Sequence, residues 1–203
     1  HEIRTPMSLI ISPLQQLMAK DKDAECRKLY STIQRNAERI LQLVNQLMDI
    51  RKIDKGQMSL MFKKAEIVSF TRDLLETFEQ QTRVKKLDLK FHTSAPEIEM
   101  WIDPKNFDKI ILNLLSNACK FTPENGQVEI SLSTGEDTHL PQNAPLRRYV
   151  ELTVADSGIG IASTEREHIF ERFYQIRNSQ NNSNIGTGIG LHLTRSLVEL
   201  HYG

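Results

Sequence analysis

Three polar side chains recur at helical spacing in the largely apolar segment 110–121. Asn113, Asn117 and Lys120 fall at i, i+4 and i+7, so we expect them on one face of a helix. The opposite face is apolar and consists of Ile110, Ile111, Leu114, Leu115 and Ala118. Two amide oxygens and an ammonium suit a Mg²⁺–triphosphate, because Mg²⁺ takes hard oxygen ligands and bridges phosphates. A polar stripe that only faces water fits the same spacing.

A turn that follows a β-rich run carries an acidic side chain and two glycines. Asp156 is followed by Gly158 and Gly160. Glycine permits a tight turn and a close approach of the backbone to a ligand. Asp156 is then placed to accept a hydrogen bond from a donor such as the exocyclic amine of adenine. The alternative is an ordinary turn without a ligand.

A second glycine-rich turn opens the last predicted helix, at 191–201. Backbone N–H groups ahead of a helix N-terminus, together with the helix dipole, favour phosphate binding. Three alternating glycines alone are a weak indication. The residues of this turn that we expect to bind the nucleotide are Gly186, Thr187, Gly188, Gly190 and Leu191.

The segment between the two glycine turns has the composition of a nucleotide lid. An aromatic stretch at 169–174 precedes a polar tract at 177–184, which we expect to be mobile because it has almost no apolar side chains. An aromatic hinge and a mobile tract ending at phosphate-binding glycines describe a lid, which we place at about 175–188. Arg177 is a further candidate for phosphate binding. Phe170 and Phe173 also fit simple core packing.

All three blocks in this order, each in the right local context, are difficult to attribute to chance. The sequence resembles the ATP-binding domain of sensor histidine kinases, a branch of the family that includes the gyrase, Hsp90 and MutL ATPases. The N, G1, F and G2 boxes of that domain correspond to 113–122, 156–161, 169–175 and 186–191. The resemblance implies ATP and Mg²⁺ as cofactors, with Asn117 and Asn113 as metal ligands, and Lys120 and the glycine amides on the phosphates.

The first six residues resemble the H box of the phosphoacceptor helices in the same kinases. The resemblance implies that His1 is the nucleophile towards phosphorus, and that Glu2 orients its ring and accepts the other N–H proton. Thr5 lies one helical turn after His1 and could position a water for the reverse reaction, so phosphatase activity is a further expectation. Pro6 is expected to bend the helix there. A histidine at a chain terminus also fits the remnant of a tag.

Two long amphipathic helices must present His1. Apolar residues recur at near-helical spacing over 3–18 and again over 29–53, and the polar stretch 20–23 separates the two runs. The pattern predicts an antiparallel helical hairpin, which we assign to a first domain at 1–57. A hairpin cannot bury both apolar stripes alone, so we expect a homodimer through a four-helix bundle.

The remainder, 58–203, alternates between helical and β-rich patterns. Helices are predicted at 66–85 and 104–120, and strands at 87–92, 127–133 and 149–155, with a surface loop at 135–147. The expected fold class is therefore α+β: the helical hairpin followed by an α/β sandwich that binds ATP.

Composition excludes several other classes of protein. Lys+Arg and Asp+Glu number 26 each, so overall charge gives no case for direct nucleic-acid contact. Cys26 and Cys119 lie in helical patterns without metal-ligand spacing and are expected to be free thiols. No apolar run approaches the roughly 20 residues that span a bilayer.

These features predict a protein-histidine kinase core that transfers phosphate from His1 to a receiver-domain aspartate, in a separate protein or the same polypeptide. The resemblance places it as a cytoplasmic segment of a longer, membrane-anchored sensor, with some similarity to hybrid kinases. One alternative is an ATPase of the wider family without a histidine acceptor. Another is a dimerisation module whose pocket only senses nucleotide.

Overall fold

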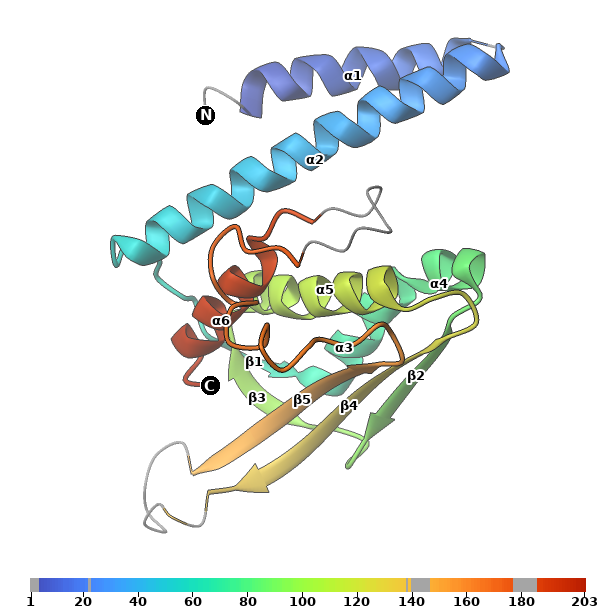
Figure 1. Ribbon diagram of the computed structural model, residues 1–203. Helices are drawn as coiled ribbons and strands as arrows, with labels where there is room; N and C mark the ends of the chain where they lie inside the picture. The colour runs from blue at the N-terminus through green and yellow to red at the C-terminus, as the bar shows by residue number, and fades with distance from the viewer. Residues whose placement is uncertain (1–3, 22, 138, 140–146, 177–185) are drawn as a thin grey trace. The chain divides into compact units, whose positions relative to one another are not determined.

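A computed structural model describes residues 4–21, 23–137, 139, 147–176 and 186–203 of the chain (Figure 1). The chain divides after Ser59 into two compact units. The first unit contains the helices α1 and α2, and the second contains the other described helices and strands. No helix of the described residues is long and apolar enough to cross a membrane.

The first unit is a helical hairpin of α1 (Arg4–Lys20) and α2 (Ala24–Asp54), as the sequence predicts. Asp23 starts α2 as its N-cap, because its carboxylate accepts a hydrogen bond from the Glu25 N–H at 2.8 Å. Gly56, with φ +62°, stops the helix in the left-handed conformation that glycine tolerates best. The polar stretch between the helices is thus a turn with a defined helix start after it.

Much of the hairpin's apolar surface is exposed. Met7, Leu14 and Ala37 are buried. The large apolar side chains of α1 and α2 that remain exposed are Leu9, Ile10, Leu17, Leu29, Ile33, Ile40, Leu47 and Met48. Apolar groups of this size on successive helical turns indicate a surface that another protein surface covers.

The second unit is built on a three-stranded sheet of order β2-β4-β5. Its strands are β2 (Asp88–Thr93), β4 (Gln127–Glu136) and β5 (Arg148–Asp156). β2 is parallel to β4, and β5 is antiparallel to it. Alternate residues of β4, namely Val128, Ile130 and Leu132, are fully buried, as a strand with one covered face requires.

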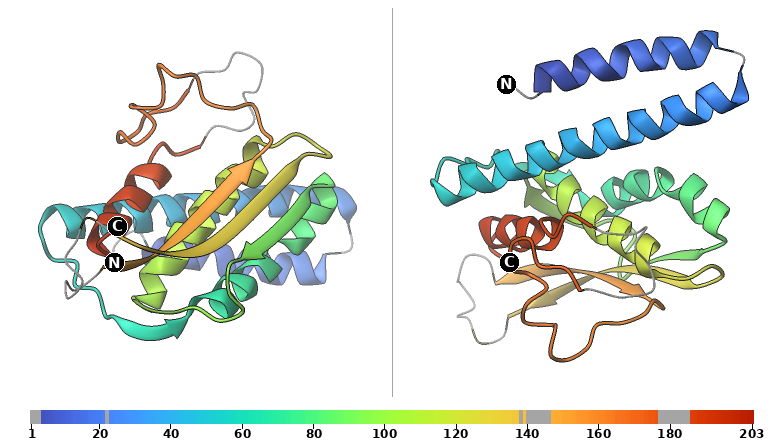
Figure 2. Two further views of the ribbon diagram at one scale, coloured as in Figure 1. Left: turned by 90° about the horizontal axis from the view of Figure 1, so that it is seen from below. Right: turned by 45° about the horizontal axis from the view of Figure 1, so that its top comes forward.

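Helices cover that buried face of the sheet. The helices are α3 (Ile67–Glu76), α4 (Glu79–Lys85), α5 (Pro104–Phe121) and α6 (Gly190–Leu200). The apolar face of α5, with Ile111 and Leu115 at its centre, packs on Val128 and Ile130 of β4. Figures 1 and 2 show α5 lying along the sheet with α6 beside it. The predicted α/β sandwich is therefore confirmed.

Two details of the predicted secondary structure are wrong. The single helix predicted at 66–85 is broken between α3 and α4, where the Thr77 hydroxyl and N–H both bond to the Leu74 carbonyl and Phe78 turns into the core. The sequence also gave no indication of β1 (Lys63–Glu66) and β3 (Glu99–Ile102), an antiparallel pair that forms a second sheet. Burial of Phe78 and pairing across the chain override the local propensities in both places.

Glu66 joins the end of β1 to the start of α3. Its carboxylate accepts hydrogen bonds from the N–H groups of Val68 at 2.9 Å, Ser69 at 2.6 Å and Ile98 at 2.9 Å. Burial raises the pKa of this carboxyl, but the three N–H donors outweigh that effect and hold the pKa at about 2. The folded state therefore stabilises the ionised form of the Glu66 carboxyl.

We expect Glu66→Gln to lower the free energy of unfolding at pH 7 by about 1 kcal/mol, because the charge at the helix start is lost. The folded pKa of about 2 lies below the ordinary 4.5, so this stabilisation is complete above pH 4.5 and is lost as the pH falls towards 2. Urea unfolding between pH 7 and pH 3 checks this. A difference between the proteins that does not shrink with acid would contradict it.

Candidate active site

Helix α5 carries the three polar residues of the predicted nucleotide site. Asp103 caps the helix by accepting a hydrogen bond from the Asn106 N–H at 3.2 Å, and Pro104 occupies its first turn. With the apolar face of α5 in the core, Asn113, Asn117 and Lys120 are half-buried on the other side. The structure thus places all three on the predicted face.

Asn113 is held by α6. Its amide nitrogen donates a hydrogen bond to Thr194 Oγ1 at 2.7 Å. A Cβ atom on Gly190 would lie 2.4 Å from Asn113 Oδ1, so a larger residue there would displace either this amide or the start of α6. Asn113 therefore anchors α6. Among the described residues, the side chain of Asn117, one turn along α5, makes no corresponding hydrogen bond to α6.

We expect Gly190→Ala to displace the Asn113 amide or the start of α6, and so to lower the free energy of unfolding by about 1–3 kcal/mol, as overpacked sites do. The affinity for ATP should fall with it. Thermal unfolding and nucleotide titration measure both effects. In an Asn113→Ala background the added methyl has room, so the loss caused by Gly190→Ala should be much smaller there. Equal losses in both backgrounds would rule out this contact as the cause.

Lys120 lies where α5 meets the second glycine turn. Its Nζ atom is 4.7 Å from the centre of the Phe121 ring. It is also 3.3 Å from the position that a Cβ atom on Gly186 would occupy. An ammonium and the start of the glycine turn, 66 residues apart in number, are therefore neighbours in space.

Lys85 fixes the end of α5, a role that the sequence does not predict. Its ammonium donates hydrogen bonds to the carbonyl oxygens of Cys119 at 2.8 Å and Lys120 at 3.0 Å. A cation at a helix C-terminus satisfies carbonyls that have no partner within the helix. Lys85 belongs to α4 and lies in a charged stretch that also fits an ordinary solvent-facing surface, so the sequence carried no signal for this contact. Cys119 itself is a buried free thiol, as predicted.

The first glycine turn follows β5 and returns to the end of α5. The Gly158 N–H donates to Asp156 Oδ1 at 2.9 Å. A Cβ atom on Gly158 would lie 2.7 Å from the Phe121 carbonyl oxygen, so glycine is needed for this close approach. Gly160 has φ +70° and open space around it, so its requirement for glycine is conformational. Asp156 is exposed beside this turn.

The second glycine turn runs beside the aromatic segment. The Phe173 N–H donates to the Gly188 carbonyl at 2.8 Å, and Gln175 Nε2 donates to the Gly186 carbonyl at 3.1 Å. Gly188 has φ +68°, and a Cβ atom there would lie 2.6 Å from the Phe173 carbonyl carbon. Thr187 Oγ1 accepts from the Ile189 N–H at 3.3 Å. The aromatic segment and the second glycine turn are therefore hydrogen-bonded to each other.

Leu191 and Thr5 are the remaining predicted site residues that the structure describes. Leu191 is half-buried in the first turn of α6, and Thr5 is exposed near the start of α1. Phe173 is 63% exposed, so core packing does not explain it. His1, Glu2 and Arg177 lie outside the described residues, as does most of the predicted lid at 175–188.

The described part of the second unit thus gathers the asparagine face of α5 and both glycine turns around the end of one helix. A helical hairpin joined to an α/β domain with this arrangement defines the class of ATP-dependent protein-histidine kinases. Residues 102–203 match the family described as histidine kinase-, DNA gyrase B- and HSP90-like ATPase, and residues 1–56 match the His Kinase A (phospho-acceptor) domain. The chain belongs to this family, and the resemblance inferred from its motifs is confirmed.

Known proteins are similar over most or all of this chain. The sensor histidine kinase TmoS of Ectopseudomonas mendocina is 38% identical over 100% of this chain, which spans 20% of TmoS. A crystal structure of full-length ShkA in complex with AMPPNP is 25% identical with a TM-score of 0.74, covering 98% of this chain and 39% of ShkA. Histidine kinase ThkA in complex with response regulator protein TrrA is 24% identical with a TM-score of 0.53, covering 86% of this chain and 48% of ThkA, and shows the fold.

Proposed function

We propose that this chain phosphorylates His1 with the γ-phosphate of ATP and that Mg²⁺ is bound with the nucleotide. The observation that carries the proposal is the convergence of Lys120, the Asn113 amide and the second glycine turn, in a chain that also has a phosphoacceptor hairpin. An ammonium, amide groups and backbone N–H donors are the groups that phosphoryl transfer needs for positioning and charge stabilisation.

Each polar group of the site has a role in this proposal. Asn117 would hold the Mg²⁺ ion through its neutral amide oxygen, which suits a hard cation without repelling the phosphates. When bound, Mg²⁺ supplies charge neutralisation on the phosphate oxygens. Asn113 supports this site from α5 while its amide nitrogen anchors α6. Lys120 and the N–H groups of 186–190 bind phosphates, and Asp156 accepts from adenine.

The proposed chemical step moves the γ-phosphoryl group from ATP to His1. One imidazole nitrogen of His1 forms a bond to the γ-phosphorus, and the bond from that phosphorus to the bridging oxygen of ADP breaks. The proton on the other imidazole nitrogen is taken by Glu2, which also fixes the orientation of the ring. Thr5 would position a water that hydrolyses phosphohistidine, in which the water oxygen bonds to phosphorus as the bond to the imidazole nitrogen breaks and free phosphate leaves.

The experiment that tests the kinase proposal is incubation of the chain with γ-labelled ATP and Mg²⁺. Phosphate bound to histidine nitrogen survives base and is lost in acid, and we expect label with that behaviour. Free phosphate without labelled protein would instead support an ATPase, and tight binding without turnover would support a nucleotide sensor. The same labelled protein, mixed with a receiver domain, should pass its label to an aspartate, by analogy with the ThkA complex.

We also propose that two copies of the hairpin pair as a four-helix bundle, because its exposed apolar side chains need a cover. We expect Ile33→Glu, which puts a charge on that surface, to convert dimers to monomers at micromolar concentration. Sedimentation equilibrium measures this. Lys28→Glu is the control, since Lys28 is an exposed charged residue of the same helix. A dimer that survives Ile33→Glu would contradict the proposal.

A further inference from the structure

Helix α6 makes contacts in two directions. Gly190 and Thr194, one helical turn apart, meet the amide of Asn113 on α5. His192 is directed instead to the aromatic segment, where its Nδ1 atom lies 3.0 Å from the Phe170 carbonyl oxygen. The position of α6 is therefore shared between the asparagine helix and the segment that continues to the second glycine turn.

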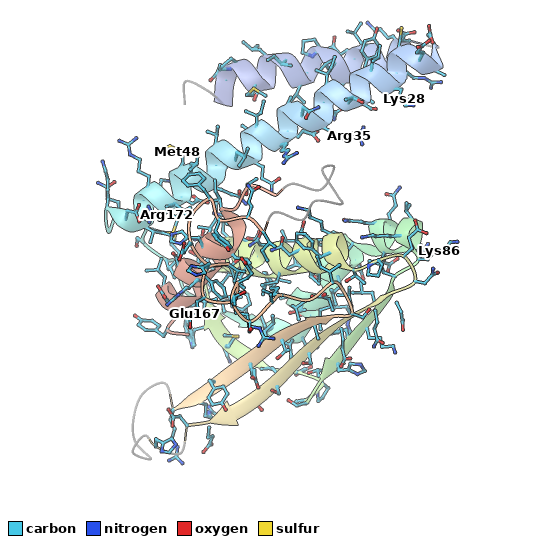
Figure 3. The ribbon with its side chains drawn as sticks, in the orientation of Figure 1. Lys28, Arg35, Met48, Lys86, Glu167 and Arg172 are labelled. Carbon is cyan, nitrogen blue, oxygen red and sulfur yellow. The ribbon has the colours of Figure 1, made fainter. Side chains whose placement is uncertain are left out.

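The two contacts of His192 determine which of its ring nitrogens donates a hydrogen bond and which accepts one. Arg172 Nε, on the residue labelled in Figure 3, lies 2.9 Å from His192 Nε2. A guanidinium has only donors, so Nε2 must accept and the ring proton must lie on Nδ1, where it donates to the Phe170 carbonyl. Both nitrogens of the imidazole therefore hold the aromatic segment.

The same segment is bonded to the glycine turn further along. Phe173 bonds to the Gly188 carbonyl and Gln175 to the Gly186 carbonyl. The stretch 170–175 is thus attached to 186–192 at three successive places, and His192 makes the attachment nearest to the body of α6. Loss of that attachment would free the segment that lines the glycine turn.

We propose that His192 is a positioning residue for the triphosphate. Through Arg172 and the Phe170 carbonyl it holds 170–175 against α6, and so keeps the N–H groups of 186–190 directed at the phosphates. This inference rests on the proposed function, in which that turn binds phosphate. His192 itself does not touch the nucleotide, and the recognition of adenine by Asp156 does not depend on it.

The test compares the affinities of the full chain for ATP–Mg²⁺ and for adenosine, measured by calorimetry. We expect His192→Ala to weaken ATP–Mg²⁺ binding by about tenfold, the size of one charge-assisted hydrogen bond, and to leave adenosine binding nearly unchanged. In labelling assays the KM for ATP should rise while the rate at saturating ATP changes little. His92→Ala, at an exposed histidine of β2, is the matched control.

Two further variants separate positioning from packing. His192→Gln keeps an oxygen that can accept from Arg172 and should restore part of the affinity. Arg172→Ala should weaken binding in the natural chain, and the losses from Arg172→Ala and His192→Ala should be less than additive, because the two residues share one contact. Unchanged ATP affinity in His192→Ala would overturn the inference, as would equal losses for ATP and adenosine with a lower melting temperature.

Failure of the kinase proposal gives a different result. If the natural chain binds ATP–Mg²⁺ without acquiring acid-labile phosphate, the kinase activity is refuted, and the affinity comparison still decides the role of His192. If the natural chain binds no ATP–Mg²⁺, both proposals are refuted together.

Discussion

Asn117→Ala will reduce the acid-labile phosphate formed on this chain by about a hundredfold or more. That is the usual cost of removing one preorganised group that acts on charge developing in the transition state. Asn117 is half-buried on the polar face of α5, and the apolar face of that helix is fixed in the core. Alanine is a good helix former, so the change should remove the proposed Mg²⁺ ligand without unfolding the helix. The initial rate of labelling with γ-labelled ATP measures it.

The dependence on Mg²⁺ distinguishes a metal ligand from a residue that merely packs. For Asn117→Ala we expect the affinity for ATP to become nearly independent of Mg²⁺, while adenosine binds as before. Ser116→Ala, at the exposed neighbour of Asn117, controls for substitution in this part of α5 and should label normally. Normal labelling by Asn117→Ala, with the natural Mg²⁺ dependence, would exclude Asn117 as the metal ligand.

Asn113 illustrates what spacing can and cannot predict. Helical spacing correctly placed Asn113 on the face of Asn117 and Lys120, because the positions of side chains around a helix follow from sequence alone. Its hydrogen bond to Thr194 joins residues 81 apart, and no local pattern contains that information. The glycines gave a partial signal. Gly190 lies directly against the Asn113 amide, but from the sequence it was only one member of a phosphate-binding turn.

The fold was predictable from the sequence where the apolar periodicity extends over many residues. The two hairpin helices, α5 and the three strands of the larger sheet have apolar periodicity over many residues, and all are present. The paired strands β1 and β3 have four residues each, and β1 is rich in charge. Their existence depends on each other, so neither has a signal of its own. His192 has no local signal for a similar reason, because its partners Arg172 and Phe170 are about 20 residues away.

His1→Gln will abolish acid-labile labelling altogether while leaving the affinity for ATP–Mg²⁺ unchanged. Glutamine has no nitrogen nucleophile comparable to imidazole, and every group assigned to nucleotide binding lies in the second unit. The comparison of labelled protein with calorimetric affinity therefore separates acceptor from binding site. His139→Gln, at a histidine that is exposed in the second unit, should label as the natural chain does. Residual acid-labile label in His1→Gln would mean that another histidine is the acceptor.

Mixing the two inactive variants then shows which copy of a dimer supplies the phosphate. His1→Gln retains the ATP site but lacks the acceptor, and Asn117→Ala retains the acceptor but lacks the proposed metal ligand. In a mixed dimer, label can appear only on the Asn117→Ala chain, and only if the nucleotide of one copy serves His1 of the other. Labelling of the mixture establishes transfer between copies. Mixed dimers that exchange subunits but stay unlabelled, beside an active natural protein, establish transfer within one chain, because each variant then lacks one half of its own reaction.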